Sequence, residues 1–301
     1  MTRTRTPART AAAFAATFLT ASLAAAPLAA QRTTVEGRPA PTIGAAAAGT
    51  EATAFRVCGD PDNLPFSNDK REGFENKIAE LIARDLKKPV EYQWWPHRRG
   101  FVRNTLRAKD CDVVIGVPGG FDPVAATKPY YRSTYYIVSR ADRRPAVTSI
   151  DDPKLKSMKV GVHVIGNDYE NTPPAHALGT RGIRAVGFNA FYGAGSGNKP
   201  EDIINAVVDN TIDVAVVWGP LAGYYAKQAK VPLTLTPLPD ADPTSATRLP
   251  FAYNITMGVR RADKAFRLQL DSILERRSPE IARILQEYGI PTRPIVAPQG
   301  S

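Results

Sequence analysis

The stretch Cys58–Asn68 reads CGDPDNLPFSN, and the rest of the chain is organised around it. An apolar run, Phe55–Cys58, leads into it and predicts a short buried strand. Gly59, Asp60 and the prolines and asparagine that follow are turn formers, so the chain leaves this strand through a rigid, polar turn. Ligands of open α/β sheets bind outside the carboxyl ends of the strands, which makes the turn a candidate wall of a site. On local pattern alone, an ordinary strand-to-helix loop is the simpler interpretation.

Strands and helices alternate along the chain from this point. Asp112–Val117 is nearly all β-branched, as expected of a strand that is buried on both faces. Asp213–Trp218 repeats that pattern in a second set of elements. The order predicts an α/β protein of two lobes, each with a mixed or parallel sheet flanked by helices, and a cleft between them. We expect strands at 55–58, 89–94, 112–117, 130–139, 158–164, 183–188, 213–218, 233–238 and 251–260, and helices at 73–87, 101–108, 199–209, 221–228, 262–277 and 279–288.

The first 30 residues have the pattern of a secretory signal. Three arginines form a basic start, and the apolar run Ala11–Ala26 is followed by small residues. We expect cleavage after Ala30 and an exported protein, which is periplasmic if the source is a Gram-negative bacterium. The apolar run is too short for a membrane anchor, and no later stretch is long enough to span a membrane. Residues 31–53 are rich in Ala, Pro, Gly and Thr and are predicted to form a flexible leader.

Composition and charge narrow the class of partner. Of 301 residues, 43% are hydrophobic and 23% are charged, which is typical of a soluble globular protein. The formal charge is +10, and because three of these charges belong to the predicted signal, which has no acids, +7 remains on the mature chain. This balance suits an acidic protein partner or substrate, although the protein can equally be basic for no specific reason. Nucleic acid is excluded as a partner, because Lys and Arg never run beyond pairs.

The two cysteines, Cys58 and Cys111, raise the question of a disulfide, which export permits. If Asp60 and Gly116 end neighbouring parallel strands at the same level, Cys111 lies about three residues behind Cys58. That offset is roughly 10 Å along a strand, which is too far for a bridge without a bulge. Two buried thiols are therefore favoured over a disulfide.

Four strings resemble one protein family in its own order: CGDPDNLPFSN, GFENKIAELIARDL, WWPHRRGFVRNTLRAKDCDVVIGVP and KPYYRSTYY. They are similar to the MxaJ/XoxJ family, the solute-binding-like proteins associated with quinoprotein methanol dehydrogenases. The resemblance implies a type II periplasmic binding protein fold whose chain crosses twice between lobes, near Tyr136–Ala141 and Leu249–Asn254. Lobe 1 is then expected at 54–138 plus 252–291, lobe 2 at 139–251, and a tail at 292–301.

The same resemblance makes two positions informative. Amino-acid-binding members of this fold hold the ligand's carboxylate with an Arg and its amine with an acid. Those positions correspond here to Pro123 and Trp218, so both charged groups are missing. Arg132 is a possible substitute, and Asp122 is adjacent. Amino-acid binding therefore loses its main support.

An aromatic, turn-rich cleft remains as the candidate site for a ligand or a protein partner. One of Tyr130 and Tyr131 is expected in the core. In the string WWPHRR, Trp94 and Trp95 should face opposite ways, one buried and one exposed, and Arg98 adds a basic rim. A loop that caps the second strand explains this string about as well. The candidate residues are Asp60, Asn63, Phe66, Trp95, Arg98, Phe121, Tyr130, Tyr131, Asn167, Asp168, Tyr192 and Trp218.

The sequence offers no catalytic, cofactor or metal site. The glycine-rich run 116–120 lacks the Lys-Ser or Lys-Thr of a phosphate loop, and the three histidines have no metal-ligand spacing. The resemblance implies a non-enzymatic accessory protein that contacts a PQQ-dependent methanol or alcohol dehydrogenase and aids its assembly or activation. The cofactor and the metal would then belong to that partner. The alternative is the substrate-binding component of an ABC importer for a small ligand that is not an amino acid.

Overall fold

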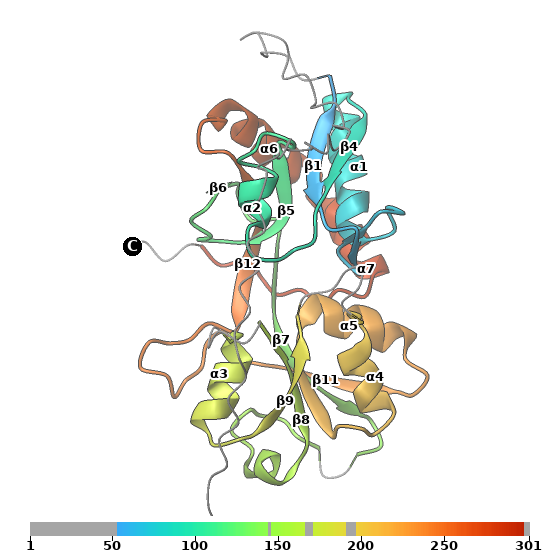
Figure 1. The fold of residues 1–301 in the computed structure, drawn as a ribbon, viewed down its shortest axis with the longest axis vertical. Coiled ribbons are helices and arrows are strands. Elements are labelled where there is room, and N and C mark those ends of the chain that lie inside the picture. Colours follow the sequence, from blue (N-terminus) through green and yellow to red (C-terminus); the bar gives the residue numbers. More distant parts are fainter. Residues whose placement is uncertain (1–52, 144–145, 166–170, 191–196, 298–301) are drawn as a thin grey trace, which may run out of the picture. The chain divides into compact units, whose positions relative to one another are not determined.

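The computed structural model describes residues 53–143, 146–165, 171–190 and 197–297. The predicted signal peptide, most of the predicted leader and three predicted cleft residues, Asn167, Asp168 and Tyr192, lie outside these ranges. In the described part, two groups of strands are flanked by helices (Figure 1), which confirms the predicted α/β class. None of the helices in the described ranges is long and apolar enough to cross a membrane.

The sheet of the first lobe places the Cys58–Asn68 turn. β1 (Phe55–Gly59) pairs in parallel with β4 (Val90–Trp94) on one side and with β5 (Val113–Pro118) on the other. β12 (Ala252–Val259) continues the sheet antiparallel to β5, and the short β6 (Ala125–Ala126) pairs with β12. Because β1, β4 and β5 are parallel, their carboxyl ends meet at one edge, where the loops that follow them come together.

Helices from both ends of the described chain share the core of this lobe. α1 (Phe74–Leu86) buries an apolar stripe at helical spacing, which includes Ile78 and Ile82. Apolar residues of α6 (Lys264–Arg276) and α7 (Ser278–Glu287) belong to the same buried cluster. The C-terminal helices therefore pack on the first lobe, far in sequence from the strands that they cover.

The sheet of the second lobe has the order β11–β7–β10–β8–β9, with β10, β8 and β9 parallel to one another. One face is covered by α3 and the 3-10 helix Pro153–Ser157, and the other by α4 and α5. Valines and isoleucines on both faces of the strands are buried, as in a doubly covered sheet. The elements are β7 (Tyr131–Arg140), β8 (Val160–Val164), β9 (Ala185–Asn189), β10 (Val214–Trp218), β11 (Leu233–Pro237), α3 (Pro173–Thr180), α4 (Asp202–Val208) and α5 (Gly219–Gln228).

β7 connects the two sheets. Its first part, Tyr131–Thr134, pairs with β12, and its second part, Tyr135–Ser139, pairs with β10. The path of paired strands is therefore continuous from one lobe to the other (Figure 1), instead of forming two separate sheets. Eight of the ten residues of β7 are buried, and only Tyr135 and Arg140 are partly exposed. The exact lobe boundaries, 138/139 and 251/252, stay predictions.

The cysteines correct the sequence analysis: Cys58 and Cys111 form a disulfide, with 5.4 Å between their Cα atoms. The expected register is right, because Cys58 lies opposite Val114, three residues after Cys111. The expected separation was wrong, because it placed Cys111 in an extended strand, whereas β5 begins only at Val113. Residues 110–112 precede the strand and are not part of it, so strand spacing does not apply to Cys111, which lies beside Cys58.

Several short elements also differ from expectation, and the helix α3 was not predicted. The Cys58–Asn68 turn contains a small antiparallel pair, β2 (Asp62–Asn63) with β3 (Ser67–Asn68). The helix predicted over 101–108 is shorter, since α2 spans Phe101–Asn104 and turns follow it. Thr105 explains the early end, because its hydroxyl donates to the Phe101 carbonyl oxygen at 2.7 Å and its own backbone leaves the helical region.

Candidate functional site

A pocket of about 420 Å³ lies between the lobes, at the carboxyl ends of several strands. The first lobe contributes the turn after β1 and the end of β5. The second lobe contributes the ends of β8 and β10. The residues that carry its chemistry are Asn63, Phe66, Gly116, His163, Trp218 and Tyr253. Three of the predicted residues, Asn63, Phe66 and Trp218, are therefore brought together here.

Asp60 stabilises the turn after β1, which forms the first lobe's wall of the pocket. Its side chain is buried, and its two carboxylate oxygens accept hydrogen bonds from the backbone N–H groups of Asp62 at 2.9 Å and His97 at 2.6 Å. The Ser67 hydroxyl donates to the Asp60 carbonyl oxygen at 2.8 Å. Asp60 thus ties the turn after β1 to the loop after β4, because one carboxylate satisfies donors from both.

An aromatic cluster forms the opposite wall. The Trp218 ring lies edge-on to Tyr135, with 5.2 Å between ring centroids, and to Tyr253, with 5.9 Å. Burial raises the pKa of Tyr135 above its ordinary value, so its phenol stays protonated. Tyr135 and Tyr253 were missed by the sequence analysis. Their pairing could not be inferred from spacing, because they come from β7 and β12, which are far apart in the chain.

Two histidines on the wall of this pocket are held neutral. Burial lowers the pKa of His163 to about 4. Burial also lowers the pKa of His97, against the opposing effect of the Asp60 carboxylate. Among the described residues that line the pocket there is no Asp, Glu, Lys or Arg. The described lining of the pocket is therefore aromatic and uncharged near neutral pH, and suits apolar or aromatic groups better than ions.

A buried acid lies directly behind the floor of the pocket. Glu75 is 7% exposed, and its carboxyl makes no hydrogen bond to the described part of the chain. Burial raises the pKa of Glu75 well above its usual range, and the nearby Asp60 raises it further. Gly116 has a φ of +83°, and a Cβ there would overlap Oε1 of Glu75. The bare backbone of Gly116 is what leaves room for this acid, which sequence reasoning also missed.

The two positions at which the resemblance predicts charged ligand-binding groups lie in different hollows. Trp218 lines the inter-lobe pocket, whereas Pro123 lines a second hollow beside it. The two substitutes considered from the sequence pair with other residues. Arg132 pairs with Asp240 at 3.0 Å, and Asp122 pairs with Arg261 at 2.7 Å. Neither lines the inter-lobe pocket.

The remaining predicted residues lie apart from one another. Tyr131 is 3% exposed and belongs to the core of the first lobe, whereas Tyr130 is half-buried against it. Trp94 and Trp95 are both half-buried, so the expected contrast between them was wrong. Trp94 stacks on Tyr92, with 4.3 Å between ring centroids, and Trp95 packs against the cluster that contains the disulfide.

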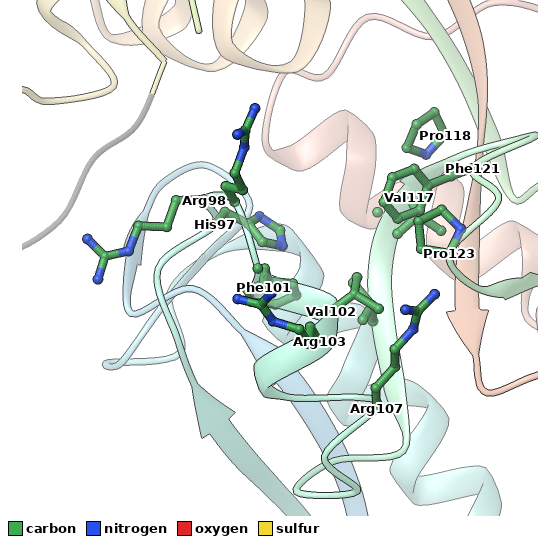
Figure 2. Close-up of a pocket in the computed structure, with 14 residues that line it drawn as sticks. His97, Arg98, Phe101, Val102, Arg103, Arg107, Val117, Pro118, Phe121 and Pro123 are labelled. Carbon is green, nitrogen blue, oxygen red and sulfur yellow. The ribbon is translucent and has the colours of Figure 1, made fainter. Parts of the chain in front are cut away.

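Arg98 and Phe121 line a second hollow, of about 480 Å³, which we call the arginine groove (Figure 2). It lies between α2 and the end of β5 with the loop that follows it. Its basic residues are Arg98, Arg99, Arg103 and Arg107, and its apolar residues include Phe101, Val102, Val117, Phe121 and Pro123. His97, Gly116 and Pro118 line both hollows, so the arginine groove adjoins the inter-lobe pocket.

Comparison with known proteins agrees with this architecture, although no protein-family model matches the chain. Protein MoxJ of Methylorubrum extorquens strain AM1 is 32% identical over 290 residues, which are 92% of this chain and 94% of MoxJ. The crystal structure of the periplasmic binding protein XoxJ from Methylobacterium extorquens AM1 is 34% identical, with a TM-score of 0.64, and covers 80% of this chain and 100% of XoxJ. That of MxaJ from Methlophaga aminisulfidivorans MPT is 26% identical over the same shares, with a TM-score of 0.68. These structures confirm the predicted two-lobed type II periplasmic binding protein fold.

Proposed function

Because the chain belongs to the MoxJ/MxaJ/XoxJ family of periplasmic-binding-protein-like proteins, we propose that it is a periplasmic accessory protein of methanol oxidation. In this role it contacts a PQQ-dependent methanol or alcohol dehydrogenase and aids its assembly or activation. The protein carries out no catalysis of its own, and the quinone cofactor belongs to the dehydrogenase.

The observation that carries this proposal is that the described lining of the inter-lobe pocket contains no charged residue. A solute-binding protein for an amino acid needs a cation for the carboxylate and an acid for the amine. The described lining provides neither, and the available alternatives, Arg132 and Asp122, are paired elsewhere. The fold has kept its two lobes while the polar groups that hold such a solute are absent from the described walls.

Surface charge supports a protein partner. Of the formal charge of +10, +7 remains on the predicted mature chain, and four arginines line the arginine groove. A basic face next to exposed aromatic and apolar side chains is typical of protein interfaces, in which Arg and aromatic residues contribute much of the binding energy.

Affinity capture from the periplasm of the source organism tests the proposal. The tagged protein is expected to retain the dehydrogenase, whereas an unrelated tagged solute-binding protein from the same periplasm retains none. Deletion of the gene is expected to lower dehydrogenase activity per molecule of dehydrogenase. Normal specific activity in the deletion strain, together with no capture, would contradict the accessory role.

The alternative function, solute binding for an importer, rests on the inter-lobe pocket itself. A volume of about 420 Å³ with walls of Phe66, Trp218 and Tyr253 is large enough for a small uncharged aromatic or apolar molecule. Native mass spectrometry of protein taken from the periplasm separates the two functions. A retained small molecule, together with a more compact form in solution scattering, would favour transport.

A further inference from the structure

The arginine groove concentrates positive charge that the described part of the chain does not neutralise. Arg98, Arg103 and Arg107 are exposed, and none of the three makes an ion pair or side-chain hydrogen bond with the described residues. No Asp or Glu occurs among the described residues of the lining. Like charges that line one groove repel one another, and a bound anion would relieve this repulsion.

Several arginines elsewhere in the described part of the chain pair with acids. Arg56 and Arg260 both bond to Asp112, at 2.7 and 2.6 Å, and Arg181 bonds to Asp242 at 2.8 Å. These contacts join segments that are far apart in sequence and hold the fold together. Arg98, Arg103 and Arg107 have no such acidic partner among the described residues and line one groove together, which favours a ligand outside the chain.

The local sequence explains why the charges gather here. In RRGFVRNTLR, Phe101 and Leu106 are buried in the cluster around the disulfide, which leaves Arg103 and Arg107 on the outside. In Figure 2, the Arg107 side chain extends across the groove toward Pro123. The packing of Phe101 and Leu106 on the disulfide cluster therefore fixes the segment that presents the basic side of the groove.

The other side of the groove is apolar. Phe121 is 37% exposed, one of the larger exposed hydrophobic side chains among the described residues, and it stands beside Val117 and Pro118 (Figure 2). Val102 of α2 completes this apolar surface. An occupant that satisfies both sides needs carboxylates for the guanidinium groups and an apolar side chain for Phe121.

We propose that the arginine groove docks an acidic protein segment, with its carboxylates on Arg98, Arg103 and Arg107 and one apolar side chain against Phe121. The inference rests on the proposed function, and it assigns this segment to the dehydrogenase. A peptide fits better than a lipid surface, because the arginines border a hollow of about 480 Å³ with an apolar wall and do not form a flat basic face. The groove adjoins the inter-lobe pocket through His97, Gly116 and Pro118, so a bound segment can continue toward the aromatic walls.

Charge reversal with a matched control tests the docking site. Arg103→Glu with Arg107→Glu changes the net charge by the same amount as Arg184→Glu with Lys230→Glu, two exposed residues of the second lobe. The probe is a fluorescent twelve-residue peptide of Asp and Glu with one central Phe, and binding is followed by anisotropy. We expect the groove variant to bind at least about 30-fold more weakly and the control to bind within about threefold of wild type. Circular dichroism checks that both variants fold.

A second variant probes the apolar side. Phe121→Ala is expected to weaken binding of the Phe-containing peptide about tenfold, and to leave binding of an otherwise identical peptide with Ala in place of Phe nearly unchanged. Equal losses for both peptides would contradict the placing of the apolar side chain against Phe121.

Capture of the dehydrogenase separates this inference from the proposed function. If wild type captures the dehydrogenase and the groove variant captures it equally well, the groove inference is wrong and the accessory role stands. If wild type captures none, the accessory role fails, and the peptide measurement alone decides the groove. Binding to phosphatidylglycerol vesicles that is lost in the groove variant, with no peptide binding by wild type, would overturn the inference in favour of a lipid headgroup.

Discussion

The inter-lobe pocket and the arginine groove are neighbours with opposite chemistry. They share His97, Gly116 and Pro118, yet the pocket has aromatic, uncharged described walls while the groove has four arginines. In a solute-binding protein the ions would be expected inside the cleft, where they hold the solute. Here they lie outside it, on a surface that a large partner can reach. The proposed docking of a partner on the neighbouring surface rests on this contrast.

Removing the disulfide should have the largest effect on the stability of the groove relative to the pocket. The disulfide closes a loop of 53 residues and belongs to the cluster that includes Phe101 and Val117 of the groove. Replacing both cysteines by Ala should lower the free energy of unfolding by about 4 kcal/mol, because the unfolded chain regains that loop's freedom. Urea unfolding measures the loss, and hydrogen exchange should rise more in 97–107 than in 214–218. A loss below about 1 kcal/mol would contradict this role.

Gly116→Ala should affect the pocket and the groove together. Gly116 has a φ of +83°, and an added Cβ would collide with Glu75. Gly120 is a matched control, because it also has a φ of +83° but has open space around it. We expect Gly116→Ala to cost about 2–3 kcal/mol in urea unfolding and Gly120→Ala about 1 kcal/mol, since only the first adds a collision to the backbone strain. Equal costs would show that Glu75 moves aside freely.

Glu75→Gln should change how stability depends on pH. Burial raises the pKa of Glu75 in the folded state, so the folded protein retains a proton that the unfolded chain releases. Stability of the wild type is therefore lost as pH rises above the ordinary carboxyl pKa, by up to about 1.4 kcal/mol per pH unit from this group. The Gln variant lacks this loss, so its advantage over wild type should grow between pH 5 and pH 7.

Urea midpoints of both proteins across that range measure the difference. His163 contributes the opposite slope in both proteins, because its lowered pKa makes acid conditions destabilising below about pH 6.5. An advantage of the Gln variant that stays constant with pH would mean that Glu75 ionises normally in the fold.

Asp122→Asn should have the smallest effect, a slight gain in peptide binding at the arginine groove. Asp122 lies at the edge of the groove and forms an exposed ion pair with Arg261, worth at most about 0.5 kcal/mol. Removing its charge should leave stability nearly unchanged and strengthen binding of the acidic peptide about twofold, because one repelling carboxylate is gone. Asp151→Asn, in the second lobe, serves as the control. Weaker peptide binding by Asp122→Asn would place the peptide away from this edge.

Local patterns predicted most of the elements correctly. The stripe of Ile78 and Ile82 places α1, and the β-branched run before Pro118 places β5. These patterns work because a side chain within one element meets the core with a period that nearby residues set. They failed at α2, which stops at Asn104, because the turn there depends on the hydrogen bond from Thr105 and on the disulfide beside it.

The candidate site was predicted only in part. Asn63, Phe66 and Trp218 were named from the sequence and do line the inter-lobe pocket. Tyr135 and Tyr253 were not, since they meet Trp218 only through the pairing of β7 with β10 and β12. Arg103 and Arg107 were not named either, because isolated arginines in a sequence carry no sign of whether an acid pairs with them.

The sequence by itself determined the alternation of strands and helices, the family strings and the loss of charge at Pro123 and Trp218. Each of these is a property of residue type and order. The disulfide between Cys58 and Cys111, and the four arginines that border an apolar wall beside a pocket with an uncharged described lining, became visible only in the tertiary structure. The physical reason is that distances between remote residues depend on turns and strand pairing. Cys111 lies before the first residue of β5, so the spacing of an extended strand did not apply to it.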